Sequence, residues 1–561
     1  MFFLSSNFTM ETIECILTKN ILDSASSVGC SKMKCVLVFA LCIFSAHGAQ
    51  YRVDPLVLTD QGLIRGMKAS DGSYSSFLGV PYATVDANDP FGPALPHDGF
   101  GSLVFNAYDG LSKCPQSIPL SSRASTREGE SLDCLKMNIY SPILASTQNP
   151  LPVLVWFQGG DFAHGSAGEY NPDKLVRQGI LVVTVNYRLG PYGFMCLDIP
   201  SVPGNQGLKD QYEALVWIRN NIRAFGGNPY NVTIAGQNAG STSALLHLYS
   251  NKDKLYNKVI VESGTPQNVE MFVNGDVDAA LKLASHLGFS TSNTLEALDF
   301  LKETSYELVA GAAADLNMQF KPCREKSFSG IDNFIEYEPP ALSNPRKVRN
   351  TPVLIGHTSN EFANKIRDDS YYKTNPFYKK IEDNFNLDED KLSQAADIVR
   401  HFYIGDEDIT EARRARLEQF ESDVNVNHPI QRTITKLLNE QAQPLYEYEF
   451  SFKGEEDGVA NGEEIKYLFS SAEESDENNL IATRLTKMWS NFVKYGNPTP
   501  QAEEVLPITW NPVSSESRPY LKIDSTMEMK SRINNDRMAF WDLFYSLYEK
   551  DNKFSRECIK H

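Results

Sequence analysis

Apolar residues gather in short runs that turn-forming residues separate, a pattern typical of buried strands. Two such runs, 151–157 and 180–185, are rich in β-branched residues. The segment 208–225 is predicted as a helix between the second run and another β-rich run, 232–235. Residues 53–66 alternate enough to predict an N-terminal hairpin. This order predicts the α/β class, with a mainly parallel twisted sheet and helices on both faces.

A sharp turn is predicted directly after the run 232–235. The residues Gly-Gln-Asn-Ala-Gly follow it, and a helix-compatible segment begins at Ser241. In α/β-hydrolases a strand, turn and helix of this kind present a nucleophile, with the pattern G-x-S-x-G. Here the middle residue is Asn238, whose carboxamide has no proton that a base can remove to make a nucleophile. Because Asn accepts a positive φ more readily than most residues, the turn is expected to form without the reaction.

Further matches run along the chain in a fixed order. They comprise residues 77–83, 203–211, 214–218, 225–229, 352–356, 487–492, 496–498 and 540–541. This set resembles the type-B carboxylesterase and cholinesterase family over residues 53 to 550. The resemblance implies one large α/β-hydrolase domain with insertions.

The resemblance also implies a catalytic triad of serine, histidine and a carboxylate. Glu361 falls on the carboxylate position. Asn238 stands at the serine position, and Asn461 stands at the histidine position. A carboxamide cannot accept and return a proton near neutral pH. We therefore expect that the triad is not intact.

The loop at Gly159 resembles the oxyanion-hole loop of the family. Its last glycine is replaced by Asp161. The backbone amides of Gly159, Gly160 and Ala239 are expected to donate into the hole. An ionised Asp161 beside them would oppose a developing oxyanion, so we expect it to disrupt the hole.

Three other residues are candidates for a substitute catalytic group. Ser241 lies inside the predicted helix, where its hydroxyl is expected to serve the helix. His357 and His164 lie near motif loops and are candidate bases, although a structural role is the simpler expectation. An active carboxylic ester hydrolase with an atypical nucleophile stays open as an alternative.

Ion pairs of the family are partly retained. Arg188 and Asp210 match one structural pair, whereas the positions of another pair are occupied by Pro90 and Leu132. Losing both partners of a buried pair can cost little, while losing one is expensive. The double change therefore favours an adapted fold.

Five of the nine cysteines lie beyond residue 48: Cys114, Cys134, Cys196, Cys323 and Cys558. The resemblance implies a disulfide between Cys114 and Cys134. The second disulfide of the family is expected to be absent, because Phe289 stands where a cysteine is common. The odd count then leaves an unpaired thiol within the chain, or Cys558 pairing between chains.

The N-terminal region resembles a secretory signal. Basic residues precede an apolar run and small residues follow it, so 33–48 is predicted as a signal peptide, with a buried core segment as the alternative. Residues 1–32 are expected to be an unstructured upstream segment, and either Met1 or Met33 is the start. The domain is then expected at 49–550.

The remainder of the chain, 551–561, is predicted as a C-terminal tail without an anchor signal, so the mature protein is expected to be secreted without a membrane anchor. Asn231, in the sequence Asn-Val-Thr, is a candidate glycosylation site.

The formal net charge of −18 at pH 7 argues against nucleic acid or an anionic membrane as a partner. No cofactor or metal motif is recognised. The protein is expected to be a non-catalytic family member, similar to the neuroligin and glutactin type, that binds or adheres to an extracellular protein or a small apolar ligand. A hydrophobic-ligand carrier is an alternative.

The aromatic helix expected at 538–548 packs on the core or pairs two copies into a homodimer.

Overall fold

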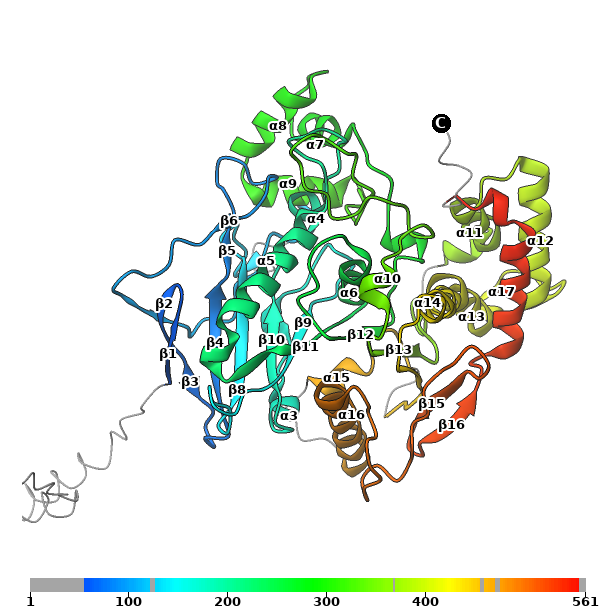
Figure 1. Ribbon diagram of the computed structural model, residues 1–561. Coiled ribbons are helices and arrows are strands. Elements are labelled where there is room, and N and C mark those ends of the chain that lie inside the picture. The colour runs from blue at the N-terminus through cyan, green and yellow to red at the C-terminus, as the bar shows by residue number, and fades with distance from the viewer. Residues whose placement is uncertain (1–54, 122–126, 367–368, 455–458, 470–474, 554–561) are drawn as a thin grey trace, which may run out of the picture. The chain divides into compact units, whose positions relative to one another are not determined.

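The predicted sheet forms the centre of the computed structural model, which describes residues 55–121, 127–366, 369–454, 459–469 and 475–553 (Figure 1). In these residues eleven strands form one sheet, in the order β16-β15-β14-β13-β12-β11-β9-β10-β8-β4-β3. The strands from β15 through β10 pair in parallel. Only the edges, β8, β4 and β3 on one side and β16 on the other, are antiparallel. The predicted α/β-hydrolase class is confirmed.

The strand bounds follow the chain. They are β1 (Leu56–Thr59), β2 (Gly62–Arg65), β3 (Met67–Lys68), β4 (Tyr74–Pro81), β5 (Ala83–Thr84), β6 (Leu95–Pro96), β7 (Val104–Asn106), β8 (Lys136–Pro142), β9 (Leu151–Phe157), β10 (Leu181–Val185), β11 (Gly227–Gln237), β12 (Lys258–Glu262), β13 (Val353–Thr358), β14 (Leu445–Phe450), β15 (Pro519–Ile523) and β16 (Glu528–Ser531). The expected N-terminal hairpin is the pair β1 and β2.

The α-helices are α3 (Asp173–Val176), α4 (Gly190–Phe194), α5 (Gln206–Asn221), α6 (Ala239–Tyr249), α7 (Ala279–His286), α8 (Thr294–Glu303), α9 (Tyr306–Asp315), α10 (Pro345–Val348), α11 (Pro376–Asn384), α12 (Glu389–Ile404), α13 (Arg414–Ser422), α14 (His428–Asn439), α15 (Ile465–Leu468), α16 (Asp476–Tyr495) and α17 (Asn535–Leu547). Local signals set their ends. For example, the Ser475 side chain caps the start of α16, and Gly496 ends that helix in the left-handed region.

Side-chain alternation along the central strands builds a core on each face of the sheet. On β9, Val153 and Val155 face a cluster that contains residues of α5 and α6. Leu154 and Trp156 face the opposite cluster, which contains residues of α3 and α16. Helices therefore cover both faces, as the continuous apolar runs predict.

A third apolar cluster is built by helices that lie to one side of the sheet (Figure 1). α11, α12, α13 and α17 contribute to it, and α17 buries Met538, Trp541 and Phe544 there. The aromatic C-terminal helix thus packs within its own chain. Its Leu543 and Leu547 remain exposed.

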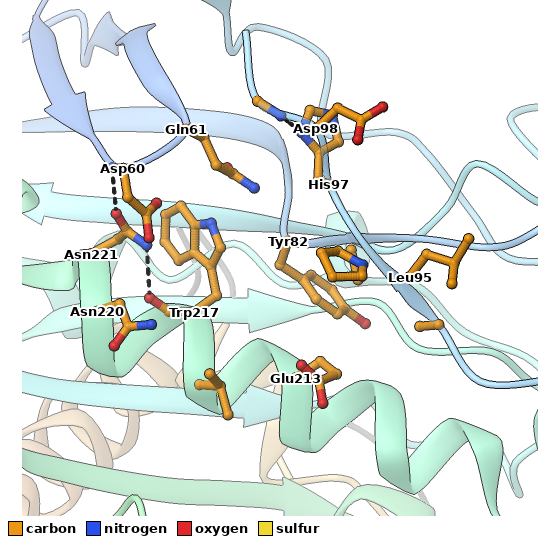
Figure 2. Close-up of a pocket in the computed structure, with 15 residues that line it drawn as sticks. Asp60, Gln61, Tyr82, Leu95, His97, Asp98, Glu213, Trp217, Asn220 and Asn221 are labelled. Atoms are coloured by element: carbon orange, nitrogen blue, oxygen red, sulfur yellow. Dashed lines mark hydrogen bonds between the residues drawn. The ribbon is translucent and has the colours of Figure 1, made fainter. Parts of the chain in front are cut away.

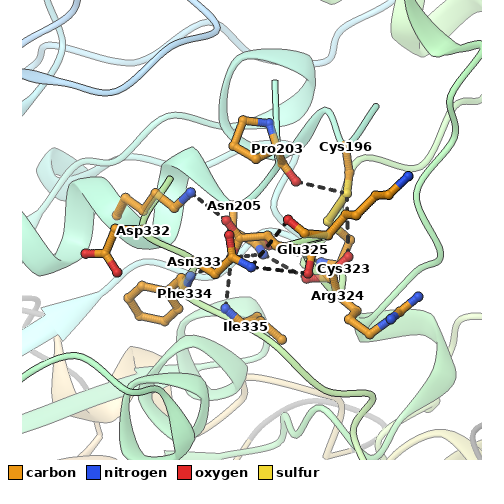
Figure 3. Close-up of polar contacts among 12 residues, drawn as sticks. Cys196, Pro203, Asn205, Cys323, Arg324, Glu325, Asp332, Asn333, Phe334 and Ile335 are labelled. Atoms are coloured by element: carbon orange, nitrogen blue, oxygen red, sulfur yellow. Dashed lines mark hydrogen bonds and ion pairs between the residues drawn. A yellow bond between two sulfur atoms is a disulfide. The ribbon is translucent and has the colours of Figure 1, made fainter. Parts of the chain in front are cut away.

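Two disulfides tie loops of the molecule together. The predicted bond between Cys114 and Cys134 is present. A second disulfide, which the sequence analysis did not predict, joins Cys196 to Cys323 across 127 positions (Figure 3). The strands and helices between the two cysteines bring them together, and Phe289 has no bearing on that pairing. Cys558 lies outside the described residues.

The retained ion pair is fully buried. Arg188 donates to both carboxylate oxygens of Asp210, at 2.8 and 2.7 Å. Its remaining amino group donates to the carbonyl oxygens of Pro90 and Gly92. The predicted pair is confirmed, and the backbone at Pro90 is held by it.

The described residues belong to a compact unit that begins at Pro55. The predicted upstream segment 1–32, the signal peptide 33–48 and most of the tail 551–561 lie outside the described residues. Within the described part of the chain, no helix combines the length and apolar character needed to cross a membrane.

Candidate functional site

The turn after β11 has the strained backbone that a nucleophile elbow requires. Asn238 has φ 54° and ψ −115°, between the end of β11 and the start of α6. The flanking glycines allow close packing: a Cβ at Gly240 would lie 2.0 Å from the carbonyl oxygen of Phe157 on β9. A Cβ at Gly236 would lie 2.4 Å from the carbonyl carbon of Gly240. The predicted positive φ is confirmed, and the lack of a Cβ at both glycines is what permits this close packing.

The side chain of Asn238 accepts hydrogen bonds from two backbone amides that come from different loops. Its Oδ1 accepts from the amide of Ala239 at 2.6 Å and from the amide of Asp161 at 3.1 Å. Two amides that converge on one oxygen form the arrangement that stabilises an oxyanion in acyl transfer. Here the oxygen at that point belongs to the protein.

The backbone amides that donate to Asn238 differ from the oxyanion-hole donors that the sequence predicts. The amide of Gly159 donates to the hydroxyl of Tyr170 at 3.2 Å, away from Asn238. Asp161, whose φ is 55°, donates its own amide to Asn238 instead. Its side chain is exposed. The replacement of the last glycine of the loop by Asp161 therefore leaves the backbone donor in place.

Glu361 and Asn461 lie in direct contact. Glu361 is fully buried, and its Oε1 accepts from the hydroxyl of Ser263 and the amide of Thr358, both at 2.7 Å. Its Oε2 accepts from Nδ2 of Asn461 at 2.5 Å. In turn, Oδ1 of Asn461 accepts from Nε2 of Gln237 at 2.6 Å. Both polar ends of the Asn461 side chain are thus engaged.

The structure therefore brings the three predicted positions together. Gln237 precedes Asn238 in the chain and bonds to Asn461, which bonds to Glu361. The order of the three positions in space is that of a triad, with amides at two of them. Neutral carboxamides cannot relay a proton along this chain of contacts.

Two further buried acids lie near this network and were missed in the sequence. Glu262 accepts from the indole N–H of Trp489 at 2.6 Å, and Glu464 accepts from the hydroxyl of Tyr448 at 3.2 Å. Burial raises the pKa of Glu262 to about 8. Burial, together with the negative charges of Glu262 and Glu361, raises the pKa of Glu464 well above its usual value. No sequence motif marks these acids, because only the folded sheet desolvates them.

The three residues considered as substitute catalytic groups have no described side-chain contact with the triad positions. Ser241 is fully buried and donates to the carbonyl oxygen of Gly264 at 2.7 Å, so its hydroxyl serves a neighbouring turn. His357 is also fully buried, and its Nδ1 is 2.8 Å from the carbonyl oxygen of Thr358. His164 is exposed. Among the described contacts, none joins these three residues to Asn238, Glu361 or Asn461.

A pocket of about 310 Å³ opens beside the Asn238 network. Asp161 and His164 line one wall, and the segment from Asn317 to Lys321 lines another. Asp161 connects the pocket to Asn238 through its amide. The pocket therefore adjoins the candidate site at Asp161.

A second pocket, of about 470 Å³, lies between the turn at Asp60, the loop around His97 and helix α5 (Figure 2). None of the predicted site residues lines it. Nε1 of Trp217 and Oε1 of Gln61 lack hydrogen-bond partners there, but both atoms are shielded from solvent. We therefore place the candidate site at Asn238 and not here.

The sequon residue Asn231 lies inside strand β11 and is half-buried. Its Oδ1 accepts a hydrogen bond from the ammonium group of Lys258. Glycosylation at Asn231 stays a prediction.

Across the described residues, no group of three or more His, Cys, Asp or Glu is arranged to hold a metal ion.

Comparison with known proteins agrees with this architecture. The sequence model of the carboxylesterase family matches residues 53–541. The chain is 29% identical over 545 residues to juvenile hormone esterase of Heliothis virescens, covering 87% of this chain and 93% of the relative. It is 27% identical over 529 residues to venom carboxylesterase-6 of Apis mellifera, covering 87% and 94%. It is 29% identical over 478 residues to esterase FE4 of Myzus persicae, covering 78% and 83%. The chain belongs to the carboxylesterase family.

Proposed function

We propose that this chain is a carboxylesterase-family protein that does not hydrolyse esters and instead acts by binding outside the cell. One observation carries the proposal. The side chain that replaces the nucleophile places its own oxygen against the amides of Ala239 and Asp161. The position that an oxyanion would occupy is therefore filled by Oδ1 of Asn238 itself.

Three requirements of ester hydrolysis are affected at one place. Asn238 offers no nucleophile, and Asn461 offers no base. An ester carbonyl oxygen would also have to displace Oδ1 of Asn238 from two donors before it could be polarised. Loss of a single oxyanion donor costs about 10²- to 10³-fold in kcat in enzymes that keep their triads. Hydrolysis by this site is therefore expected to be negligible.

The names of the relatives favour a second candidate, a working ester hydrolase with an atypical nucleophile. Juvenile hormone esterase and esterase FE4 are named for ester hydrolysis. Against this candidate, the hydroxyl of Ser241 is fully buried and points to Gly264. Binding without hydrolysis remains our proposal, with secretion, an extracellular protein partner, a homodimer and a glycan on Asn231 as its untested parts.

Hydrolysis of p-nitrophenyl acetate tests the proposal directly. We expect wild-type protein to show no turnover above buffer. The triple variant Asn238→Ser, Asn461→His, Asp161→Gly empties the oxyanion position and restores nucleophile and base, so it should gain turnover. Adding Glu361→Gln to the triple variant should remove most of that gain, because the carboxylate orients the new histidine.

One outcome would contradict the proposal. Wild-type turnover that an organophosphate abolishes would show a working nucleophile, and the labelled residue would identify it. A triple variant that folds and gains no more turnover than Asn238→Ser alone would contradict a narrower point, namely that substitutions at these three positions are what prevents hydrolysis.

A further inference from the structure

Lys321 is a buried cation without a partner. Its side chain is 7% exposed, on the wall of the pocket beside Asp161. Among the described residues, neither a hydrogen bond nor an ion pair satisfies its ammonium group. A buried ammonium group that lacks a direct partner is costly to a fold. Its presence therefore points to an anion that occupies the pocket.

Two nearby acids act on the charge of Lys321 without pairing with it. Burial lowers the pKa of Lys321, and the charges of Asp161 and Glu270 oppose the shift, so both carboxylates lie within electrostatic range. Glu270, however, forms an ion pair with Lys380. Asp161 forms no ion pair in the described part of the chain, and its side chain is exposed at the same pocket. The pocket thus presents one cation and one anion that are not paired with each other.

Apolar residues line part of the pocket, beside the polar residues Ser117, Asn317 and Gln319. The apolar residues are Pro119, Ala313, Ala314, Met318 and Phe320. The volume of about 310 Å³ is at the lower end of the range for small-molecule sites, which suits a ligand of amino-acid size.

The Lys321 segment is held rigidly from its C-terminal side. Cys323, two residues later, is bonded to Cys196 (Figure 3). Asn205 bonds to both the backbone amide and the carbonyl of Cys323, at 3.0 and 2.8 Å. Because the backbone is anchored two residues away, the segment loses little further freedom when a ligand binds, and such preorganisation favours affinity.

We infer that this pocket binds the zwitterion of an α-amino acid with an apolar side chain. Lys321 takes the carboxylate, Asp161 takes the ammonium group, and the apolar side chain lies against Met318 and Phe320. The inference rests on the proposed function, since it assigns a ligand to a site that binds without hydrolysis.

Isothermal titration calorimetry at pH 7 with three probes tests the assignment. L-Leucine carries both charges, N-acetyl-L-leucine lacks the ammonium group, and L-leucinamide lacks the carboxylate. Because a hydrogen bond to a charged group contributes about 1.5–3 kcal/mol, each derivative should bind about 10- to 100-fold more weakly than leucine. Lys321→Met should abolish the preference for leucine over leucinamide. Asp161→Asn should abolish the preference for leucine over N-acetyl-leucine.

Lys347→Met is a matched control. Lys347 is also 7% exposed, but its ammonium group donates to the carbonyl of His247 and the hydroxyl of Ser250, away from the pocket. We expect Lys347→Met to lower the unfolding midpoint and to leave leucine binding unchanged. Lys321→Met should abolish tight binding without lowering the midpoint, because it removes an unpaired charge. A merely structural role for Lys321 would give the opposite result for stability.

Two results would overturn the inference: no binding of leucine to the wild-type protein, or N-acetyl-leucine binding as tightly as leucine. The proposed function is tested separately, by the hydrolysis of p-nitrophenyl acetate. Hydrolysis by the same sample would contradict the proposed function. If the protein neither binds leucine nor hydrolyses the ester, the zwitterion ligand is rejected and the proposed function stands.

Discussion

At the residue scale, Asn238 combines a predictable backbone with an unpredictable side chain. The motif predicts its positive φ, because that conformation follows from local sterics. The position of Oδ1 depends on Asp161, which lies 77 positions away and contributes its amide only in the folded loop. The sequence predicts Gly159 as a donor to the oxyanion hole. In the folded loop, however, the amide of Gly159 donates to the hydroxyl of Tyr170.

Substitution of Asn238 should separate its hydrogen bonds from its backbone strain. Asn238→Ala removes the acceptor of two amides and keeps a strained φ, so we expect a loss of about 2–4 kcal/mol in the free energy of unfolding. Asn238→Gly removes the same acceptor but relaxes the backbone, so its loss should be smaller by about 1–2 kcal/mol. Urea unfolding of both variants measures the difference. Equal losses would show that the turn is not strained at this residue.

At the element scale, the sequence predicts which segments are strands and helices better than where they end. The runs 151–157 and 180–185 are β9 and β10, because continuous apolar runs are typical of buried parallel strands. The helix expected at 208–225 ends earlier, at Asn221, where a short 3₁₀ turn and Gly226 in the left-handed region redirect the chain. The strand expected at 232–235 begins at Gly227, with an irregular register before Val232. The second disulfide was missed because its pairing is tertiary.

The two disulfides should differ in their contributions to stability. In the chain-entropy model, a bond that closes a longer loop restricts the unfolded chain more. The bond between Cys196 and Cys323 spans 127 positions, against 20 for the bond between Cys114 and Cys134. We expect replacement of the long-range pair by alanines to cost about 5 kcal/mol and replacement of the short-range pair about 3 kcal/mol. Urea unfolding midpoints of the two double variants measure this order. A larger cost for the short-range pair would mean that native-state contacts, and not loop length, dominate.

At the scale of the whole molecule, the site is where several layers of the fold meet. Glu262 ends β12, Trp489 comes from α16, and Tyr448 comes from β14. Glu464 precedes α15, and Glu361 follows β13. Because these elements converge under the candidate site, their acids are desolvated together. Such convergence depends on the complete sheet, so it has no signature in any one segment.

This buried cluster should make the stability of the molecule depend on pH through Glu262. Its pKa is about 8 in the folded protein, because burial disfavours the charged form, against 4.5 for an ordinary glutamate. Between these values the folded state holds a proton that the unfolded state has released. Stability from this group is therefore present below about pH 4.5 and declines as the pH rises to about 8.

The variant Glu262→Gln keeps an acceptor for the indole of Trp489 and cannot ionise. Its urea unfolding midpoint should match that of the wild type near pH 4.5. At pH 8.5 the variant should be more stable, by on the order of a few kcal/mol. Glu516→Gln, at an exposed loop position, is the control and should show no pH-dependent difference from wild type. A gap between Glu262→Gln and wild type that stays constant across this range would show that Glu262 does not titrate differently in the folded and unfolded states.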